Sequence, residues 1–264
     1  MTDLSAFNVT HFAYGQDNLQ LVDAQPSASG DGTAVDTETN DGSAPDSGLG
    51  SLITSVLQLF YPANSINPTA DIPGGADFYA TPLDLSIANN ISLEYSVYFP
   101  PDFDWVQAGK LPGIYGGHTA CSGGDAAVTC FSTRLMWRSH GAGELYLYAP
   151  KDKQTDDLCS TPPRSVCDAD YGLSVGRGSF HFAAGNWTHV RQTVSLNTPG
   201  QQDGGFVLEV NGEVVIDRSD VFYRDIAYTV PTTTFTFFGG HDPEYASPKD
   251  QYTWFANFAM SVNG

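Results

Sequence analysis

The sequence predicts an all-β fold in which two antiparallel sheets pack face to face, as in a sandwich or jelly roll. Many short segments are rich in β-branched and aromatic residues, and Gly, Pro, Asn or Asp stands at the joins between them. Charged residues make up only 16% of the chain, which disfavours long surface helices. The 264 residues are enough for one large domain or two small ones.

Nine segments carry the strand pattern, and the predicted strands are 52–61, 92–99, 132–138, 144–149, 187–196, 206–211, 213–217, 232–238 and 252–262. For residues 51–59 a short helix, ended by Tyr61-Pro62, is the alternative. Asn211-Gly212 predicts a hairpin turn, because both residues tolerate a positive φ.

The first fifty residues differ from the rest of the chain. Residues 3–22 contain enough apolar side chains to pack as a peripheral strand or arm. Residues 23–50 are acidic, rich in Gly and Ser and without aromatic side chains, so we expect a long loop there. We therefore divide the chain into an N-terminal arm and acidic loop at 1–50 and a β domain at 51–264.

The formal charge of −19, with only 11 Lys and Arg, argues against a general nucleic-acid binder. The longest apolar stretch, 49–63, is interrupted by polar residues, so we expect no membrane span. Residues 1–109 hold 14 acidic residues and no base. Five bases then fall within 44 positions, namely Lys110, Arg134, Arg138, Lys151 and Lys153. This cluster favours an anionic ligand, and local pairing with acids such as Glu144, Asp152 and Asp156 is the alternative.

Four cysteines form two close pairs in the sequence. Three connectivities are possible, and the spacing favours Cys121–Cys130 and Cys159–Cys167 as disulfides over a zinc site, because no Cys-x-x-Cys is present. Glycosylation sequons begin at Asn8, Asn90 and Asn186. Together with a polar start that lacks a signal-like apolar run, these features predict a secreted, extracellular protein from which the leader has been removed.

Residues 132–138 and 144–149 should pair as an antiparallel hairpin across a short Gly-containing loop. Alternation places Ser132 and Arg134 on one face together with Tyr146 and Tyr148, while Leu and Trp side chains turn to the core. A surface with a hydroxyl, a guanidinium and two phenols suits a sugar acid. An ordinary solvated outer face is the equally weighted alternative.

Several collinear motifs then identify a family. The runs Leu93–Trp105, Gly109–Gly117, Cys121–Gly124, Phe131–Arg138, Gly143–Tyr148, Leu208–Asp217 and Phe237–Gly240 resemble polysaccharide lyase family 14, and in particular its fungal branch. The resemblance covers residues 52–264 and implies a concanavalin-like β-jelly roll, an architecture shared with the glucuronan lyases of family 20.

The resemblance also implies five catalytic residues. The family's lysine matches Lys110, its Ser-x-Arg pair matches Ser132 and Arg134, and its Tyr-x-Tyr pair matches Tyr146 and Tyr148. These residues imply a cofactor-independent lyase that cleaves alginate or glucuronan by β-elimination.

General chemistry suggests how these residues would act. Cations lower the barrier by stabilising the charge that develops when the C5 proton, α to a carboxylate, is removed. We expect Arg134 to grip that carboxylate in a bidentate manner, with Lys110 as a second charge and Ser132 holding substrate or stabilising charge. Neighbouring cations should lower the pKa of a tyrosine enough for it to act as base, and the other phenol would act as acid.

Further expectations concern ligands and partners. His118 lies on the loop after Lys110, within reach of a cleft, and with Arg138 it is a candidate substrate-binding residue. We expect an acidic polysaccharide as the partner, a monomeric chain and no metal, since Asp102, Asp104 and Asp250 do not form a recognised calcium loop. The alternatives are a non-catalytic lectin-like module and a glycoside hydrolase, although the latter's Glu-x-Asp-x-x-Glu strand motif is missing.

Overall fold

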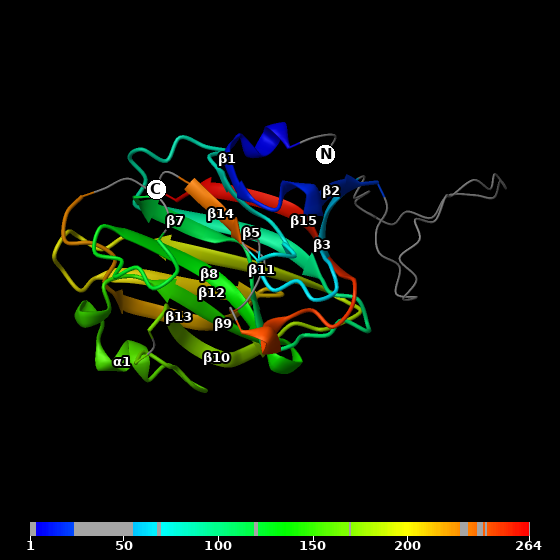
Figure 1. Ribbon diagram of the computed structural model, residues 1–264. Helices are drawn as coiled ribbons and strands as arrows, with labels where there is room; N and C mark the ends of the chain where they lie inside the picture. The colour runs from blue at the N-terminus through cyan, green and yellow to red at the C-terminus, as the bar shows by residue number, and fades with distance from the viewer. Residues whose placement is uncertain are drawn as a thin grey trace, which may run out of the picture.

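Two antiparallel sheets pack against each other in the computed structural model of the chain, which confirms the predicted all-β architecture (Figure 1). The structure describes residues 4–23, 55–67, 70–118, 121–168, 170–227, 232–236, 240 and 242–263, with the backbone alone at 232–236. Nearly all of the predicted acidic loop, and the ends of the predicted strands at 52–54 and 237–238, lie outside the described residues.

The first sheet has eight strands and carries the predicted functional face. Its order is β1 (Val9–Tyr14), β4 (Asp77–Ala80), β14 (Thr232–Thr236), β7 (Gly113–Gly117), β8 (Cys130–Arg138), β9 (Ala142–Tyr148) and β10 (Leu173–His181), and the short β6 (Ala108–Lys110) also pairs with β8.

The second sheet has seven strands and lies behind the first in Figure 1. Its order is β13 (Glu213–Val221), β12 (Gly204–Val210), β11 (Trp187–Ser195), β5 (Asn90–Tyr98), β15 (Gln251–Val262), β3 (Val56–Tyr61) and β2 (Leu19–Val22). Strands β1 and β2 come from the N-terminal arm, so residues 9–22 extend an edge of each sheet.

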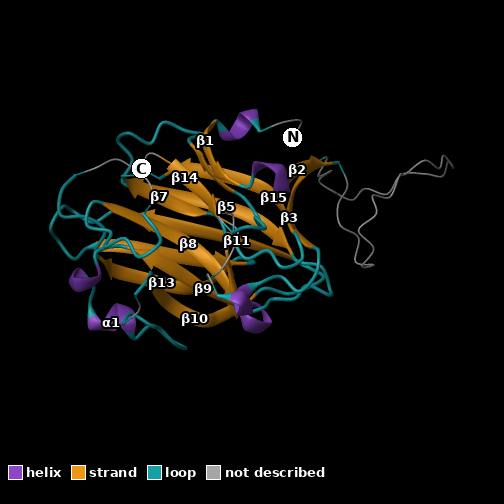
Figure 2. Cartoon of the chain, in the orientation of Figure 1, coloured by secondary structure: helices purple, strands orange, loops and turns teal. Residues whose placement is uncertain are grey.

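Helical structure in the described part of the chain is confined to single turns at the periphery (Figure 2). These turns are α1 (Asp156–Cys159) and the 3-10 turns η1 (Ser5–Phe7), η2 (Gln16–Asn18), η3 (Ser139–Gly141), η4 (Lys151–Lys153) and η5 (Pro243–Tyr245). Thr155 caps α1 by accepting a hydrogen bond from the Leu158 amide. None of the described helices is long and apolar enough to cross a bilayer.

Each of the nine predicted strand segments corresponds to a strand, although β5, β9, β11 and β12 end one residue before the predicted limit and β3 begins only at Val56. Asn211 and Gly212 have φ values of 51° and 85°, as a tight hairpin turn requires. The alternative of a helix at 51–59 is wrong for its described part, because Val56 onward is the strand β3. Strands β4, β6, β7 and β10 were not predicted, because they are short or interrupted by glycine.

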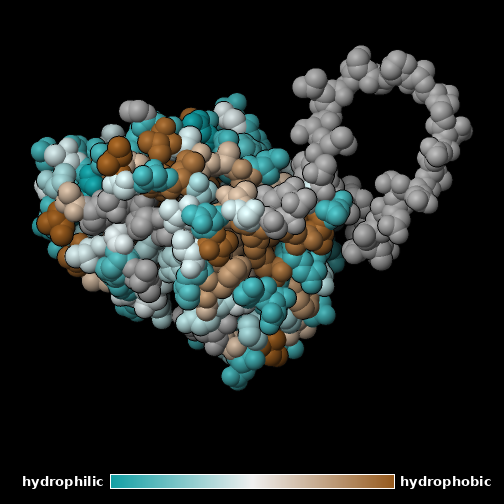
Figure 3. Space-filling view, turned by 90° about the horizontal axis from the view of Figure 1, so that it is seen from above, coloured by the Kyte–Doolittle hydropathy of each residue, from teal (hydrophilic) through white to brown (hydrophobic). Residues whose placement is uncertain are grey.

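The core lies between the two sheets, and β8 and β9 alternate as predicted. Phe131, Leu135 and Trp137 point into the core from β8, and Leu145 and Leu147 do so from β9. Ser132 and Arg134 of β8, and Tyr146 and Tyr148 of β9, alternate with these side chains and therefore stand on the outer face of the eight-stranded sheet. Elsewhere on the described surface, hydrophilic and hydrophobic residues are mixed, as the view from above shows (Figure 3).

One polar side chain crosses the apolar core directly behind this face. Gln192 of β11 is buried, and its Oε1 accepts a hydrogen bond from the Thr133 hydroxyl at 2.7 Å. Its Nε2 donates to the Pro112 carbonyl at 3.1 Å, and the Tyr95 hydroxyl donates to the same carbonyl. Buried polar groups are tolerated only when they are paired, so this bridge fixes β8 relative to the second sheet.

We predict that Q192L lowers the free energy of unfolding by about 1–3 kcal/mol, because it removes the nearer acceptor of the buried Thr133 hydroxyl, at 2.7 Å, and leaves only the Ile114 carbonyl at 3.4 Å. Urea unfolding followed by tryptophan fluorescence measures the loss. The double variant T133V/Q192L should recover most of it, since both polar partners are then removed together. Equal stabilities of the single variant and the wild type would contradict the role of the bridge.

Candidate active site

The five residues predicted as catalytic converge on the outer face of the eight-stranded sheet. Across β8 and β9, Ser132 pairs with Tyr148 and Arg134 pairs with Tyr146. Lys110 reaches the same face from β6, where it pairs with Met136. Residues that are far apart in the sequence are thus held side by side by strand register.

A cleft of about 310 Å³ opens over this face. Its walls come from β6, β8, β9, β10 and the segments that follow them, and the lining residues are Lys110, Gly123, Met136, Arg138, Tyr146, Tyr148, Val166, Tyr171, Gly172, Ser174, Arg177, Gly240, Asp242 and Tyr245. Tyr146 and Tyr148 both line the cleft, although only 8% and 2% of their surfaces are exposed.

Three cationic groups surround the ring of Tyr146. The Lys110 ammonium lies 5.8 Å from the ring centre, and the guanidinium carbons of Arg134 and Arg138 lie 6.0 and 5.9 Å from it. Arg134 also lies 5.4 Å from the ring of Tyr148. The two phenol rings meet edge to face with their centres 5.6 Å apart. The site therefore concentrates positive charge on a pair of phenols in an otherwise acidic protein.

Arg134 is 3% exposed, and its Nε and Nη2 atoms are buried with no hydrogen-bond partner among the described residues. A buried guanidinium that lacks hydrogen bonds is costly, because its lost hydration is not replaced. An anion that enters the cleft would offset part of this cost, because its negative charge would stabilise the buried guanidinium of Arg134. This is the property expected of a carboxylate-binding site.

Burial, together with the neighbouring positive charges of Arg134 and Arg138, lowers the pKa of Lys110 to about 7, although Asp77 partly opposes the shift. Lys110 as a whole is half-buried. The lowered pKa therefore reflects the surroundings of its amino group. Near neutral pH the amine thus exists in both the charged and the uncharged form.

The expectation that neighbouring cations lower the pKa of the tyrosines is wrong for Tyr146 in the free protein. Burial raises the pKa of Tyr146 well above the ordinary value, the neighbouring phenol of Tyr148 adds to the rise, and Arg134 only partly offsets it. The loss of hydration disfavours the phenolate of Tyr146 more strongly than the positive charge of Arg134 favours it. Tyr146 is therefore protonated across the physiological range.

Each phenol oxygen accepts a hydrogen bond from a backbone amide. The Gly172 N–H donates to the Tyr146 oxygen and the Gly124 N–H to the Tyr148 oxygen, both at 3.2 Å. Gly172 must lack a side chain, since a Cβ there would lie 2.6 Å from the Tyr148 ring. Amide donors stabilise negative charge on a phenol oxygen, so both positions are equipped to carry a transient phenolate.

The two predicted disulfides, Cys121–Cys130 and Cys159–Cys167, are present. The first closes the loop that carries Gly124. Ser132 is buried, and its hydroxyl donates to the Cys121 carbonyl at 3.1 Å, so in this structure it fixes the loop over Tyr148. Ser132 thus lies within the predicted group, and its hydroxyl is bonded to the loop backbone.

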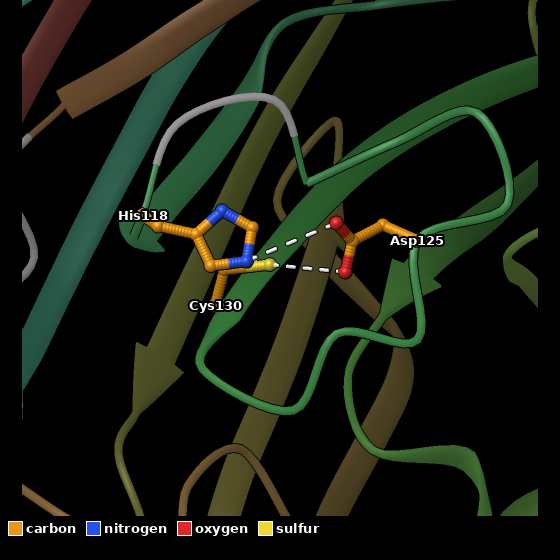
Figure 4. A group of neighbouring side chains, drawn as sticks. All are labelled: His118, Asp125 and Cys130. Carbon is orange, nitrogen blue, oxygen red and sulfur yellow. Dashed lines mark hydrogen bonds and ion pairs between the residues drawn. The ribbon is translucent and has the colours of Figure 1, made fainter.

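His118 is exposed at the end of β7 and is not among the residues that line the cleft. Its Nε2 lies 3.8 Å from an oxygen of Asp125, and Cys130 completes a three-residue group with them (Figure 4). Because the Cys130 sulfur is bonded to Cys121, it is no thiolate, and the group offers a cation only one imidazole and one carboxylate. His118 is thus placed beside the active face and outside its cleft.

Arg138 lines the cleft as predicted, and it is also paired with Glu144, the acid named as its alternative partner. Arg177, on β10, binds the same carboxylate at 2.9 Å, as does Ser174 at 2.6 Å. Arg177 was not predicted from the sequence. Simple alternation places it on the core side with Leu173 and Val175, and only an irregularity of β10 turns it outward.

The three sequons differ in their surroundings. Asn186 is exposed at the turn before β11, and Asn8 is exposed but its amide nitrogen donates to the Thr81 carbonyl at 2.9 Å. Asn90 is half-buried at the start of β5, where its side-chain oxygen accepts from Asn263. Glycosylation of these residues stays a prediction, with Asn186 the most open acceptor.

Comparisons with known proteins agree with this geometry. The model of the family Polysaccharide lyase 14 matches residues 51–258. The solved alginate lyase of that family from Aplysia kurodai is 28% identical, with a TM-score of 0.77 over 98% of this chain and 93% of that one. The alginate lyase vAL-1 from Chlorella virus is 26% identical, with a TM-score of 0.67 over 79% of this chain and 85% of that one.

Two more distant proteins resemble this chain in fold alone or over only part of its length. The endo-β-1,4-glucuronan lyase from the fungus Trichoderma reesei shares the fold, with a TM-score of 0.55 over 97% of this chain and 91% of that one, at only 10% identity. Exolysin of Paramecium bursaria Chlorella virus 1 is 24% identical over 173 residues, which are 59% of this chain and 26% of that protein's length.

The jelly-roll sheets and the match over most of the chain define the class: the chain is an enzyme of the polysaccharide lyase type. It belongs to polysaccharide lyase family 14. The special resemblance to the fungal branch of that family stays a prediction.

The charge environment of Lys110 gives a direct test of the site. Of the four lysines in the chain, Lys110 alone should titrate with a pKa of about 7, which NMR of lysine side chains can follow with K110R as the assignment control. In R134M the pKa of Lys110 should rise, because a neighbouring positive charge has been removed. A value for Lys110 near that of the other lysines, or an unchanged value in R134M, would contradict the described site.

Proposed function

We propose that this polysaccharide lyase cleaves a polyuronate by β-elimination, and that Lys110, Arg134, Tyr146 and Tyr148 carry the reaction. The observation that supports this most is the buried Arg134 guanidinium, with two nitrogens lacking partners among the described residues, beside two phenols that line the cleft. A sugar carboxylate is the anion that such a site would take, and a phenol next to it is placed to move a proton.

Lys110 and Arg134 would stabilise the charge that develops on the uronate carboxylate when the adjacent carbon loses its proton. Because Nε and Nη2 of Arg134 are covered in this conformation, Arg134 acts here as a buried positive charge rather than as the bidentate clamp expected from the sequence. Lys110, which lines the cleft, is the cation that contacts the carboxylate. Ser132 supports the reaction indirectly by fixing the loop that holds Gly124 over Tyr148.

The environments of the two phenols suggest different roles. The raised pKa of Tyr146 suits a proton donor, so Tyr146 would give its proton to the leaving oxygen at C4. Tyr148 would accept the C5 proton, with the Gly124 amide and the nearby Arg134 stabilising its phenolate. The C5–H electrons form the C4–C5 double bond as the C4–O bond breaks, and the proton on Tyr148 then returns to solvent while Tyr146 is reprotonated.

For the substrate we infer alginate first. The solved enzymes from Aplysia kurodai and Chlorella virus, at 28% and 26% identity, are named alginate lyases, whereas the glucuronan lyase shares only the fold. Whether mannuronate or guluronate is preferred depends on the walls of the cleft. Two disulfides and three sequons support secretion to an extracellular compartment, where we propose that the enzyme acts as a monomer on its acidic polysaccharide.

Incubating the protein with alginate should produce new ultraviolet absorbance from an unsaturated uronyl end. R134M should lose about 10²–10³-fold in rate, and Y146F/Y148F should lose the signal, without unfolding the protein. R218Q is the matched control, because Arg218 pairs with Asp220 on β13, far from the cleft residues in sequence and on the other sheet. Binding of polyuronate without any new absorbance would instead indicate the lectin-like alternative, and release of reducing ends without unsaturation would indicate a hydrolase.

The pH dependence follows from Lys110. If its charged form is required, kcat/KM should fall as the pH rises through about 7, tenfold per unit above it, because kcat/KM reports the free enzyme. The decline in kcat should begin at higher pH, since a bound carboxylate raises the pKa of the ammonium. Initial rates at constant ionic strength test this. A kcat/KM that increases through pH 7 would contradict the role of the Lys110 cation and assign proton abstraction to its uncharged amine.

A further inference from the structure

Beside Tyr146, the cleft wall contains a buried carboxylate held by two arginines. Glu144 has no exposed surface, although it stands on the cleft face of β9. Its Oε1 accepts hydrogen bonds from Nε and Nη2 of Arg138, and its Oε2 accepts from Nε of Arg177 at 2.9 Å and from the Ser174 hydroxyl at 2.6 Å. We call these four residues the Glu144 cluster. Its carboxylate is fully paired, and its net charge is +1.

An irregularity of β10 brings Arg177 into the cluster. Val175 pairs with Leu145 of β9, but the next pair is Phe180 with Gly143, so β10 has extra residues here. Gly176 and Gly178 flank Arg177 with φ values of 64° and 86°, a conformation that other residues adopt only at a cost. The bulge turns Arg177 away from the core and toward Glu144, as bulges near active sites commonly redirect a side chain.

The cluster leaves hydrogen-bond donors for a ligand. Nη1 of Arg138 and both terminal nitrogens of Arg177 donate to no described residue, and neither arginine is fully buried. Both arginines line the cleft, and Arg138 stacks 5.9 Å from the ring centre of Tyr146. Neutralising one buried carboxylate requires only one guanidinium, so the second makes this wall of the cleft cationic. Asp242 is the acidic residue on the described lining that opposes it.

We propose that Arg138 and Arg177 form a second carboxylate subsite, which binds another uronate residue of the same polymer chain, and that Glu144 is the positioning residue that orients them. The inference rests on the proposed function for its substrate class. A polyuronate carries a carboxylate on every residue, so a chain whose reacting carboxylate lies at Lys110 and Arg134 presents further carboxylates along the cleft. The two cationic groups adjoin each other at Tyr146, since Lys110, Arg134 and Arg138 all lie about 6 Å from the centre of its ring.

Binding of oligouronates of increasing length tests the subsite. We would use the Y148F background to prevent cleavage, and titrate saturated alginate oligomers, from disaccharide to hexasaccharide, by calorimetry with and without R177M. The affinity should increase by a distinct step at the length that first reaches the subsite. R177M should remove that step, a loss of about 10–100-fold for the longer oligomers, while the shorter ones bind as before. R177K, which keeps the charge but not the fork, should restore part of the step.

The matched control is R191M, because Arg191 lies on the second sheet, paired with Glu94 and Glu209. It should leave the step unchanged. A step of the same size in R177M would overturn the subsite. Because these titrations need no turnover, they separate the two proposals: a wild-type protein that binds with the length step but produces no unsaturated product would overturn the lyase mechanism and support the subsite.

The positioning role of Glu144 has its own measurement. E144Q removes the charge that holds the two guanidiniums together, so it should lower the affinity only for oligomers that reach the subsite. The double variant E144Q/R177M should bind no more weakly than R177M, because both changes remove one interaction. Additive losses, or an equal loss for short and long oligomers, would show that Glu144 acts on the fold alone and would overturn its assignment as the positioning residue.

Discussion

The pairing of β8 with β9 is the constraint on which the rest of this site depends. It sets Arg134 opposite Tyr146 and Ser132 opposite Tyr148, so a guanidinium and two phenols share one surface. A slip of one residue in this register would turn those side chains into the core and bring leucines to the cleft. The hydrophobic residues of the hairpin therefore fix the chemistry indirectly, because Leu135 and Leu145 must remain between the sheets.

Desolvation is the common physical cause of the properties of the site. The same burial lowers the pKa of Lys110 and raises that of Tyr146, since it disfavours the charged form of each group. It also leaves Arg134 without compensation for its lost hydration. The proposed polyuronate would bring carboxylates to a cleft beside Arg134, whose Nε and Nη2 atoms have no partner among the described residues. The negative charge of the proposed ligand would thus complement the positive charge of Arg134.

Two different uses of arginine stand next to each other. Arg134 is buried with two nitrogens that lack partners in the described part of the chain, whereas Arg138 and Arg177 share the buried carboxylate of Glu144. The first arrangement leaves a buried positive charge that lacks hydrogen-bond partners beside the two phenols. In the second arrangement, the Glu144 carboxylate is fully hydrogen-bonded and holds both guanidiniums in place, while each arginine keeps donors for a ligand. Such an arrangement is expected of a group that orients a polymer rather than one that takes part in the reaction.

The sequence by itself determined nine of the strand segments and the faces of the central hairpin, because alternation of apolar and polar residues is a local property that the pleat of a strand converts into two distinct faces. The short or glycine-interrupted strands β4, β6, β7 and β10 lack such a pattern. The short spacing of the cysteines likewise indicated both disulfides. Only the tertiary structure decided the electrostatics. The pKa of Tyr146 depends on how deeply neighbouring strands bury it, and the position of Arg177 depends on a bulge that reverses its expected side. Burial and bulges arise from contacts between distant segments, which no local pattern of residues encodes.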